Sequence, residues 1–277
     1  MEECTKDTEI GLGTVADATV FVGDYPFSGE ASADWQQTCA GLQRAGIEKG
    51  IVSPIEAVFR EDFDQVESQL CDALSNLPQW RVFKTINPLQ PWWRGQMRMK
   101  DHPFAGIRLF ALYHGYSLSS PLAMEVFDFA REHALPVQVF CRMQDRRMQY
   151  GHLATEVSME EVHDVLTLGQ KGNTVLLSGL GAGQINQLVT TTQVPPNVFF
   201  DTSRLQGAWK TFEMLGAETI AKHLVFGSLW PINCPECPLT QIKYAKLGSC
   251  VRDAVVRGNF ERFIMCDLRG PQGPAKC

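Results

Sequence analysis

Short apolar runs alternate with longer amphipathic segments along the whole chain. Eight runs of three to five residues are rich in β-branched or aromatic side chains, a composition typical of the buried strands of a parallel sheet. The runs are 20–22, 50–52, 82–86, 106–110, 137–140, 174–177, 197–200 and 223–226. The segments between them are long enough to form a helix and return to the sheet.

Several of these segments carry the signals of helix boundaries. One amphipathic pattern runs from Ser32 to Ala45 and is followed by glycine, and a second runs from Asp62 to Leu77 and is followed by proline. Ser158 stands three residues before Glu161, which is the spacing of a capping box and predicts a helix start. The Pro- and Trp-rich stretch from Pro88 to Arg94 is instead expected to be a long loop after the third strand.

Strands that alternate with helices predict parallel pairing with right-handed crossovers. Eight such units close into a single (β/α)8 TIM barrel, a fold of about 250 residues, and the chain has 277. An open doubly wound sheet is the structural alternative, but no Gly-x-Gly-x-x-Gly follows the first strand. We find no domain break, so we expect one domain over residues 1–277, with a frayed tail at 270–277.

Composition and charge exclude several classes of partner. The chain is 44% hydrophobic and 20% charged, with a formal net charge of -6, so nothing suggests a basic surface for nucleic acid. No stretch approaches the roughly 18 consecutive apolar residues of a membrane span. The first residues, 1–4, include two acidic ones and lack the basic and apolar regions of a signal peptide, so we expect a cytoplasmic protein.

The nine cysteines are odd in number and scattered, which favours reduced thiols in a cytoplasmic protein over a disulfide framework. One pair has the Cys-x-x-Cys spacing, Cys234 and Cys237. A zinc site would need two further ligands at suitable spacing, and the sequence has no second pair of this kind. We therefore expect these two residues to be free thiols, and their role is left open.

One segment resembles a known family. Residues 17–23 read Asp-Ala-Thr-Val-Phe-Val-Gly, which is similar to the first barrel strand of the amidohydrolase superfamily, Asp-Ala-His-Val-His-Val-Gly. Five further stretches resemble that family's strands and C-terminal motif in the same order: 106–116, 136–140, 197–203, 224–231 and 258–263. The resemblance covers most of the chain and implies the same (β/α)8 barrel.

The residues that hold a metal in that family are replaced in this chain. Thr19 and Phe21 stand at the two histidine positions of the first strand, Phe140 at the fifth-strand histidine, and Leu229 at the aspartate of the eighth strand. The sixth-strand histidine falls in Ser-Gly-Leu at 178–180. Phenyl and aliphatic groups are not metal ligands, and the family uses its metal to activate water. The resemblance therefore implies a hydrolase-like fold with a degenerate metal site, and we expect no metal and no other cofactor.

Polar residues at the C-terminal strand ends are the candidates for a binding site, because active sites of this fold lie at that face. Arg108 lies within the fourth strand and Arg142 follows the fifth. A guanidinium group suits two-point contact with a carboxylate, so we predict that both bind a small anionic, carboxylate-type molecule. Further contacts are expected from Tyr113, Tyr116, Asp145, Trp230 and Asp24.

Two residues are candidates for acid/base catalysis without a metal. His114, in the loop after the fourth strand, titrates near neutral pH, and Asp201, at the end of the seventh strand, is a matching carboxylate. In a second interpretation the barrel is a non-catalytic pseudoenzyme that binds a ligand or a partner protein. Arg108 then forms a structural ion pair, for example with Asp201, and His114 caps a loop.

A third interpretation is a metal-dependent hydrolase or decarboxylase with displaced ligands such as His114, Asp201 or Cys141. The sequence does not decide whether the protein is an enzyme, which substrate it takes, or whether it forms a homo-oligomer. One structural result would favour the second interpretation: Arg142 and His114 directed to bulk solvent, with the barrel mouth filled by Phe21, Phe140, Leu229 and Trp230.

Overall fold

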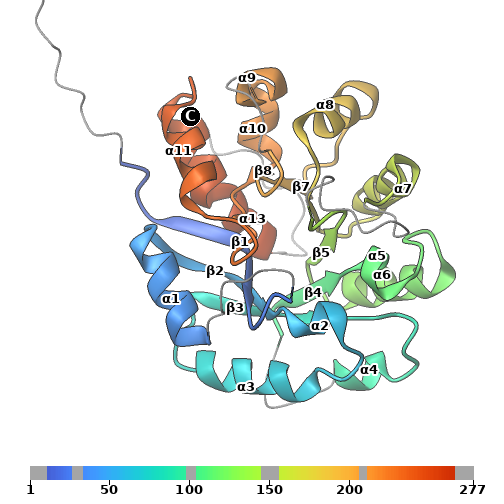
Figure 1. Ribbon diagram of the computed structural model, residues 1–277. Helices are drawn as coiled ribbons and strands as arrows, with labels where there is room; N and C mark the ends of the chain where they lie inside the picture. Colours follow the sequence, from blue (N-terminus) through green and yellow to red (C-terminus); the bar gives the residue numbers. More distant parts are fainter. Residues whose placement is uncertain (1–10, 27–33, 98–103, 145–155, 206–210, 266–277) are drawn as a thin grey trace, which may run out of the picture.

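The computed structural model confirms a single (β/α)8 barrel (Figure 1). It describes residues 11–26, 34–97, 104–144, 156–205 and 211–265. Eight strands lie in sequence order, and every neighbouring pair is parallel. The strands are β1 (Val15–Val22), β2 (Ile47–Pro54), β3 (Trp80–Thr85), β4 (Gly106–Leu109), β5 (Val137–Phe140), β6 (Val175–Ser178), β7 (Val198–Asp201) and β8 (Leu224–Val225).

The barrel closes between its first strand and the segment that follows its last. The Ala18 amide donates to the Phe226 carbonyl at 3.0 Å, and the Phe21 amide donates to the Trp230 carbonyl at 2.8 Å. Val20 and Trp230 form a parallel bridge. The short β8 is therefore extended by irregular backbone that still pairs with β1.

Helices surround the strands (Figure 1). They are α1 (Trp35–Arg44), α2 (Glu56–Phe59), α3 (Asp64–Leu74), α4 (Trp93–Gln96), α5 (Ala111–His114), α6 (Pro121–Glu132), α7 (Met159–Gln170), α8 (Ala182–Thr191), α9 (Thr211–Leu215), α10 (Ala217–His223), α11 (Glu236–Tyr244), α12 (Ser249–Asp253) and α13 (Asn259–Ile264), with a π-helical turn at Ala254–Gly258 between the last two.

Two local predictions about helices can be compared with the structure. The predicted start at Ser158 is confirmed, because its hydroxyl accepts from the Glu161 amide at 3.2 Å at the beginning of α7. The stretch from Pro88 to Arg94 is not wholly a loop, because α4 begins within it at Trp93. The ring of Trp93 packs edge-on against Phe129 of α6 at 5.4 Å, and this tertiary contact supports a helical turn that the local sequence does not signal.

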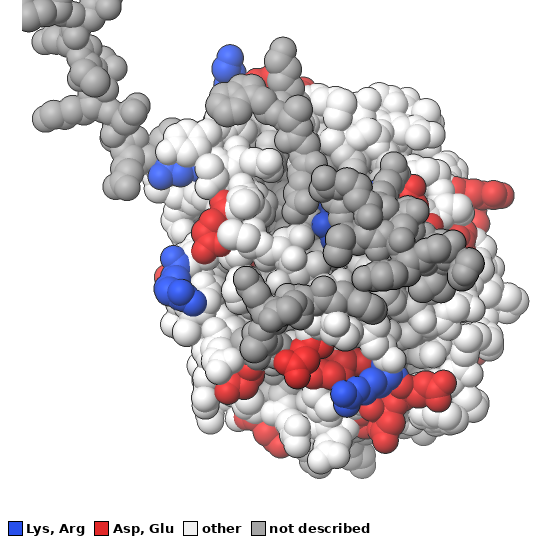
Figure 2. Space-filling view, in the orientation of Figure 1, with Lys and Arg blue, Asp and Glu red and all other residues white. Residues whose placement is uncertain are grey.

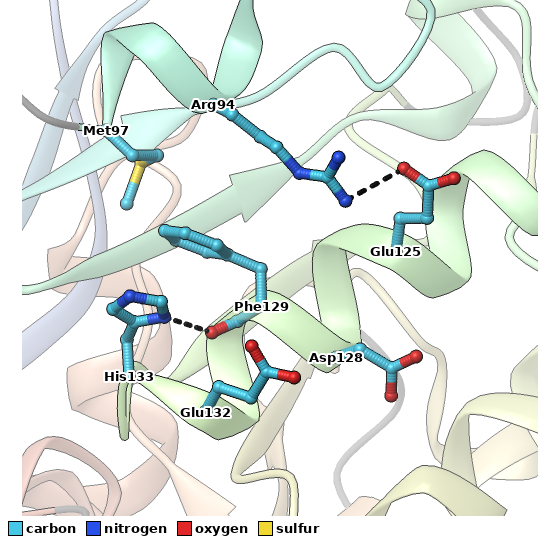
Figure 3. A pocket seen from close by; sticks show the side chains of 7 residues that line it. All are labelled: Arg94, Met97, Glu125, Asp128, Phe129, Glu132 and His133. Atoms are coloured by element: carbon cyan, nitrogen blue, oxygen red, sulfur yellow. Dashed lines mark hydrogen bonds and ion pairs between the residues drawn. The ribbon is translucent and has the colours of Figure 1, made fainter.

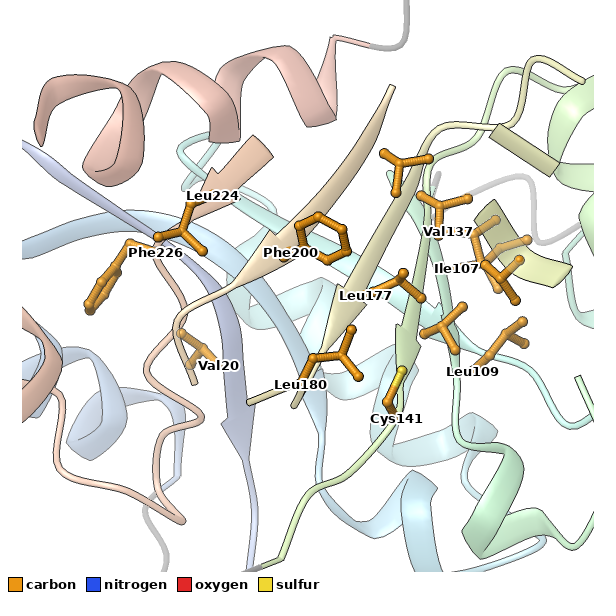
Figure 4. Close-up of a cluster of buried hydrophobic side chains, with 14 of the residues drawn as sticks. Val20, Ile107, Leu109, Val137, Cys141, Leu177, Leu180, Phe200, Leu224 and Phe226 are labelled. Atoms are coloured by element: carbon orange, nitrogen blue, oxygen red, sulfur yellow. The ribbon is translucent and has the colours of Figure 1, made fainter. Parts of the chain in front are cut away.

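The larger apolar core lies between the strands and the helices. It contains outward-facing strand residues such as Ile107, Leu109, Val137 and Leu177, all fully buried (Figure 4). Because successive side chains of a strand point to opposite faces, the residues between these point into the barrel.

The barrel interior is built in three layers. An apolar layer that includes Leu176 and Phe199 comes first along the strands. Two residues further along come the polar residues Arg108, Gln138, Ser178 and Asp201, which are all fully buried. Beyond this polar layer, towards the C-terminal strand ends, the interior is filled by aromatic side chains.

Within the described residues, no helix is long and apolar enough to cross a membrane. The tail expected at 270–277 lies outside the described residues, so that expectation and the single-domain prediction for 1–277 stay predictions.

Candidate functional site

Apolar side chains fill the C-terminal mouth of the barrel, where active sites of this fold lie. We call them the mouth cluster: Phe21, Ile55, Val58, Phe110, Phe140, Met143 and Leu229, each at most 2% exposed. The rings of Phe110 and Phe140 stack at 4.7 Å, and Phe21 lies 5.4 Å from Phe140. Three of the four apolar residues named in the sequence-based test are in this cluster. The other condition of that test is not met, because the Arg142 side chain is only 11% exposed and His114 donates to the Ala57 carbonyl.

The fourth residue of that test, Trp230, lies elsewhere. Its ring packs close to Gly41 of α1, where a Cβ atom on the glycine would approach it to 3.1 Å. The side chain therefore belongs to the core between strands and helices, and only its backbone carbonyl pairs with β1. The expectation that Trp230 lines the mouth is not met, because the backbone after Leu229 directs the indole outward.

The residues at the family's metal-ligand positions do not fit a divalent metal. Phe21, Phe140 and Leu229 supply no donor atom and pack against one another. The Thr19 hydroxyl already accepts from the Leu229 amide at 2.8 Å. The Ser178 hydroxyl accepts from the Gln138 side chain at 2.8 Å. Across the described part of the chain, no group of three or more His, Cys, Asp or Glu residues is arranged to hold a metal ion.

Arg108 lies directly beneath the mouth cluster and bonds only to protein acceptors. Its Nε donates to Gln138 Oε1 at 2.8 Å. Its terminal nitrogens donate to three backbone carbonyls, those of Val20 at 2.9 Å, Ala18 at 3.0 Å and Ile51 at 3.1 Å. The guanidinium thus joins β4 to β1, β2 and β5 and is directed away from solvent. Its predicted contact with a ligand stays a prediction.

Aromatic rings cover the face of the same guanidinium. Arg108 Cζ lies 4.7 Å from the centre of the Phe21 ring and 5.6 Å from that of Phe140. Burial lowers the pKa of Arg108 to about 9, and the charges of Asp17 and Asp201 act in the opposite direction, so the group remains charged at neutral pH. No direct ion pair joins Arg108 to Asp201 in the described structure, so the carboxylates act on Arg108 at longer range.

Asp201 lies in the polar layer, fully buried. Its Oδ1 accepts from the Gly179 amide at 3.1 Å and from the Ser203 hydroxyl at 2.7 Å. Burial raises the pKa of Asp201 to about 6, although these hydrogen bonds favour the ionised form. Asp17 is also fully buried, and burial raises its pKa in the same way.

His114 ends the short helix α5 at the edge of the mouth cluster. Its Nε2 donates to the Ala57 carbonyl of α2 at 3.2 Å, and its ring lies 6.0 Å from Phe110. Burial lowers the pKa of His114, so the imidazole is neutral at neutral pH. His114 contacts α2 whereas Asp201 contacts the ends of β6 and β7, so the structure does not join the two predicted acid/base groups by a hydrogen bond.

Of the other predicted site residues, Arg142, Tyr116 and Asp24 lie in the described part of the chain. Arg142 is mostly buried and lies 3.5 Å from a carboxylate oxygen of Glu156. The ring of Tyr116 lies 6.4 Å from that of His114, and burial raises the pKa of its phenol. Asp24 is exposed, and Asp145 lies outside the described residues.

A cationic residue that the sequence analysis missed lies at the mouth. Arg204 follows β7 by three residues, is 8% exposed and donates to Asn233 Oδ1 at 3.4 Å. Burial raises the pKa of the Tyr113 phenol, while the nearby charge of Arg204 lowers it. The sequence analysis selected Asp201 because it lies at the C-terminal end of a strand. Arg204 lies three residues after the same strand end and could have been selected on the same ground.

Two phenols and an amide accompany Arg204. Tyr113 packs edge-on against Phe59 at 5.4 Å, and Phe59 lies 6.2 Å from Tyr25. Gln144 donates to the Tyr25 hydroxyl at 3.1 Å. Both tyrosines pack against the mouth cluster. We call Arg204, Tyr113, Tyr25 and Gln144 the rim cluster, a polar group set on an apolar base.

Cys234 and Cys237 flank the start of α11 and are exposed. The Cys234 thiol donates to Glu236 Oε2 at 2.8 Å, and this hydrogen bond raises its pKa. The expectation that both are free thiols in reducing buffer stays a prediction.

Comparison with known proteins bears on the fold. No protein-family model matches the sequence, and no curated protein matches it. A 2,6-dihydroxybenzoate decarboxylase in complex with 2,6-dihydroxybenzoate superposes with a TM-score of 0.67 at 12% identity, covering 91% of this chain and 98% of that one. The chain has the barrel fold of that enzyme.

Two further solved structures give the same result. The 5-carboxyvanillate decarboxylase of Sphingomonas paucimobilis has a TM-score of 0.66 at 12% identity, with 92% of this chain and 99% of that one covered. A protein of Pseudomonas putida assigned as a 2-pyrone-4,6-dicarboxylic acid hydrolase has a TM-score of 0.64 at 15% identity, with the same coverage. These neighbours are amidohydrolase-superfamily barrels, in agreement with the sequence resemblance.

Proposed function

We propose that this chain binds a small carboxylate-bearing molecule at the barrel mouth and does not carry out metal-dependent hydrolysis. The rim cluster is the observation that carries the proposal. It places one guanidinium and two phenols above an apolar base, at the face where ligands of this fold bind.

The chemistry of the rim cluster suits a carboxylate. The Arg204 guanidinium offers paired donors in the geometry of a carboxylate, and the phenols of Tyr113 and Tyr25 offer further hydrogen bonds. The mouth cluster beneath them makes the base of the rim apolar. The solved neighbours support this class of ligand, since the names of all three describe enzymes of carboxylate compounds.

Arg204 takes over the role that the sequence analysis gave to Arg108. Arg108 lies beneath the mouth cluster, where Phe21 and Phe140 cover its guanidinium, whereas Arg204 lies near Tyr113, which packs against that cluster from the rim. Arg142 lies at the end of β5 and is a second cation at the same face. We assign no acid/base step to His114 and Asp201, because the described contacts do not bring them to one place.

A non-catalytic binding protein is the second candidate function. The filled mouth favours it, because Phe21, Phe140 and Leu229 occupy the space in which a reacting centre would have to lie. In this case the rim cluster binds a ligand without turning it over, or the barrel serves as a scaffold for a partner.

Carboxylate binding is tested by titration calorimetry with 2,6-dihydroxybenzoate as the probe. We expect the wild-type protein to bind it and Arg204→Met to bind it about tenfold to a hundredfold more weakly, because a hydrogen bond to a charged group contributes ~1.5–3 kcal/mol. Arg44→Met, which removes an exposed cation of α1, is the matched control and should bind normally. Failure of the wild-type protein to bind, or equal binding by Arg204→Met, would contradict the proposal.

The proposed absence of a bound metal has its own test. Elemental analysis of protein purified without chelator should give far less than one zinc, iron or manganese ion per chain. The variant with both Thr19→His and Phe21→His should remain metal-free, because Phe140 and Leu229 still supply no donor on the opposite side. One metal ion per wild-type chain would contradict this proposal. If removal of that ion also abolished a catalytic activity, the result would support a metal-dependent enzyme whose ligands lie at other positions than in the family.

A further inference from the structure

The described residues leave a gap on the outside of the barrel between α4 and α6. A cavity of about 630 Å³ lies there, with Arg94 and Met97 on the α4 side and Glu125, Phe129 and Glu132 on α6 (Figure 3). We call this feature the α4–α6 groove. It lies on the outside of the barrel and is separate from the rim cluster.

The connection between β3 and β4 covers little of α6 with its described helix. Its described residues contain only the four-residue helix α4, whereas α6 has twelve residues. At 1.5 Å per residue, α4 is about 6 Å long and α6 about 18 Å long. The described part of this connection therefore covers only a fraction of the facing side of α6.

The base of the groove is apolar. The Phe129 ring packs edge-on against Trp93 at 5.4 Å, and the His133 ring stacks on it at 4.0 Å. Figure 3 shows Phe129 and His133 side by side. Large apolar side chains continue outside the cavity: Trp92 is 57% exposed and Leu122 is 41% exposed. Leu122 precedes Glu125 by three residues and so lies on the same face of α6. An exposed apolar surface of this kind marks a binding site.

The α6 wall of the groove is acidic. Glu125, Asp128 and Glu132 all line it, and Arg94 faces them from α4, where it pairs with Glu125 at 3.0 Å (Figure 3). Among the described residues, Glu132 has no ion-pair partner. Figure 2 shows acidic side chains gathered in the lower part of the molecule, around the position of α4 in Figure 1.

We propose that the α4–α6 groove docks a basic segment of a partner protein. An apolar side chain of the partner enters beside Phe129 and Met97, and flanking Lys or Arg residues pair with Asp128 and Glu132. Charge complementarity selects this occupant: three carboxylates line the wall, Arg94 pairs with Glu125, Arg131 of the same helix pairs with Asp128, and the described structure gives Glu132 no ion pair. A second copy is disfavoured, because each copy has a formal net charge of -6 and would bring acidic surface against the acidic wall.

The test uses a fluorescently labelled 14-residue peptide that forms an amphipathic helix of leucine and lysine. We expect it to bind the wild-type chain, and the pair Asp128→Lys with Glu132→Lys to weaken binding about tenfold or more, since two attractive charges become repulsive. The pair Glu48→Lys with Glu213→Lys changes the net charge equally at exposed positions outside the groove and should change binding less than about twofold. Fluorescence anisotropy measures both.

A second variant tests the apolar part of the site. Trp92→Ser with Leu122→Ser keeps the charge and should also weaken binding of the same peptide, since exposed side chains can be replaced without unfolding the protein. Absence of peptide binding overturns the proposal, and so does equal weakening by the two charge-reversal pairs, which would indicate unspecific attraction. Self-association of the wild-type chain that is abolished by Trp92→Ser with Leu122→Ser would identify a second copy as the occupant and also overturn it.

Discussion

Replacing Arg108 by methionine is expected to lower the free energy of unfolding by about 3–5 kcal/mol. The substitution removes the guanidinium donor from the carbonyls of Val20 and Ile51, in a region that water does not reach, and leaves the Ala18 carbonyl with only the Gln138 amide as a side-chain donor. It also removes the positive charge that balances Asp17 and Asp201 in the polar layer. Loss of one partner from a buried polar network costs the full desolvation of the groups that remain.

Urea denaturation of the purified variant measures this effect. The matched control is Arg257→Met, which removes an exposed arginine that pairs with Asp253 and should cost less than about 1 kcal/mol. A cost for Arg108→Met as small as that of the control would show that the guanidinium is not structural. In that case its predicted role in ligand binding would regain support.

The second large effect is a dependence of stability on pH that comes from Asp201. The pKa of Asp201 is about 6 in the folded protein, whereas the ordinary pKa of an aspartate is 3.8. Between these two pH values the folded state therefore binds more protons than the unfolded state. Stability from this group therefore falls as the pH rises from about 4 to 6 and stays low above that range. A shift of this size corresponds to up to ~3 kcal/mol.

The variant Asp201→Asn isolates this contribution, because other buried acids titrate in the same range. The amide can keep accepting from Gly179 and Ser203, and it carries no charge to desolvate. We expect Asp201→Asn to gain stability relative to wild type as the pH rises from 4 to 7, measured by urea denaturation at each pH. The control Asp253→Asn, at an exposed position, should give a curve parallel to wild type. A parallel curve for Asp201→Asn would contradict the prediction.

Glu67 is another buried acid that titrates close to the pH range of Asp201. It is buried on α3 against Lys84 of β3, and burial raises its pKa to about 7. Lys84 also pairs with Asp64 at 2.7 Å. This buried ion pair was not anticipated, because Lys84 stands in an apolar run and nothing local indicates that a helix carboxylate lies opposite it.

Local patterns were enough to predict the fold. The apolar runs match β1 to β8, and the run at 137–140 matches β5 residue for residue. This succeeds because the two-residue period of a strand and the boundary signals of a helix are properties of neighbouring residues. The same period places the side chains of Phe21 and Phe140 on the inner face of the barrel. Because a phenyl ring has no atom that can bind a metal, the sequence predicts that these two inner positions do not contribute to a metal site.

What the sequence by itself determined is therefore the barrel and the residue types at its inner positions, such as Phe21, Arg108 and Phe140. Only the tertiary structure decided which partners those positions meet. Arg108 bonds to carbonyls 88 and 90 residues away in the sequence, at Val20 and Ala18. Closure of the barrel creates these contacts, and no local pattern encodes them. For the same reason the sequence does not show that Phe21 and Phe140 cover the Arg108 guanidinium, because these three side chains come from three different strands.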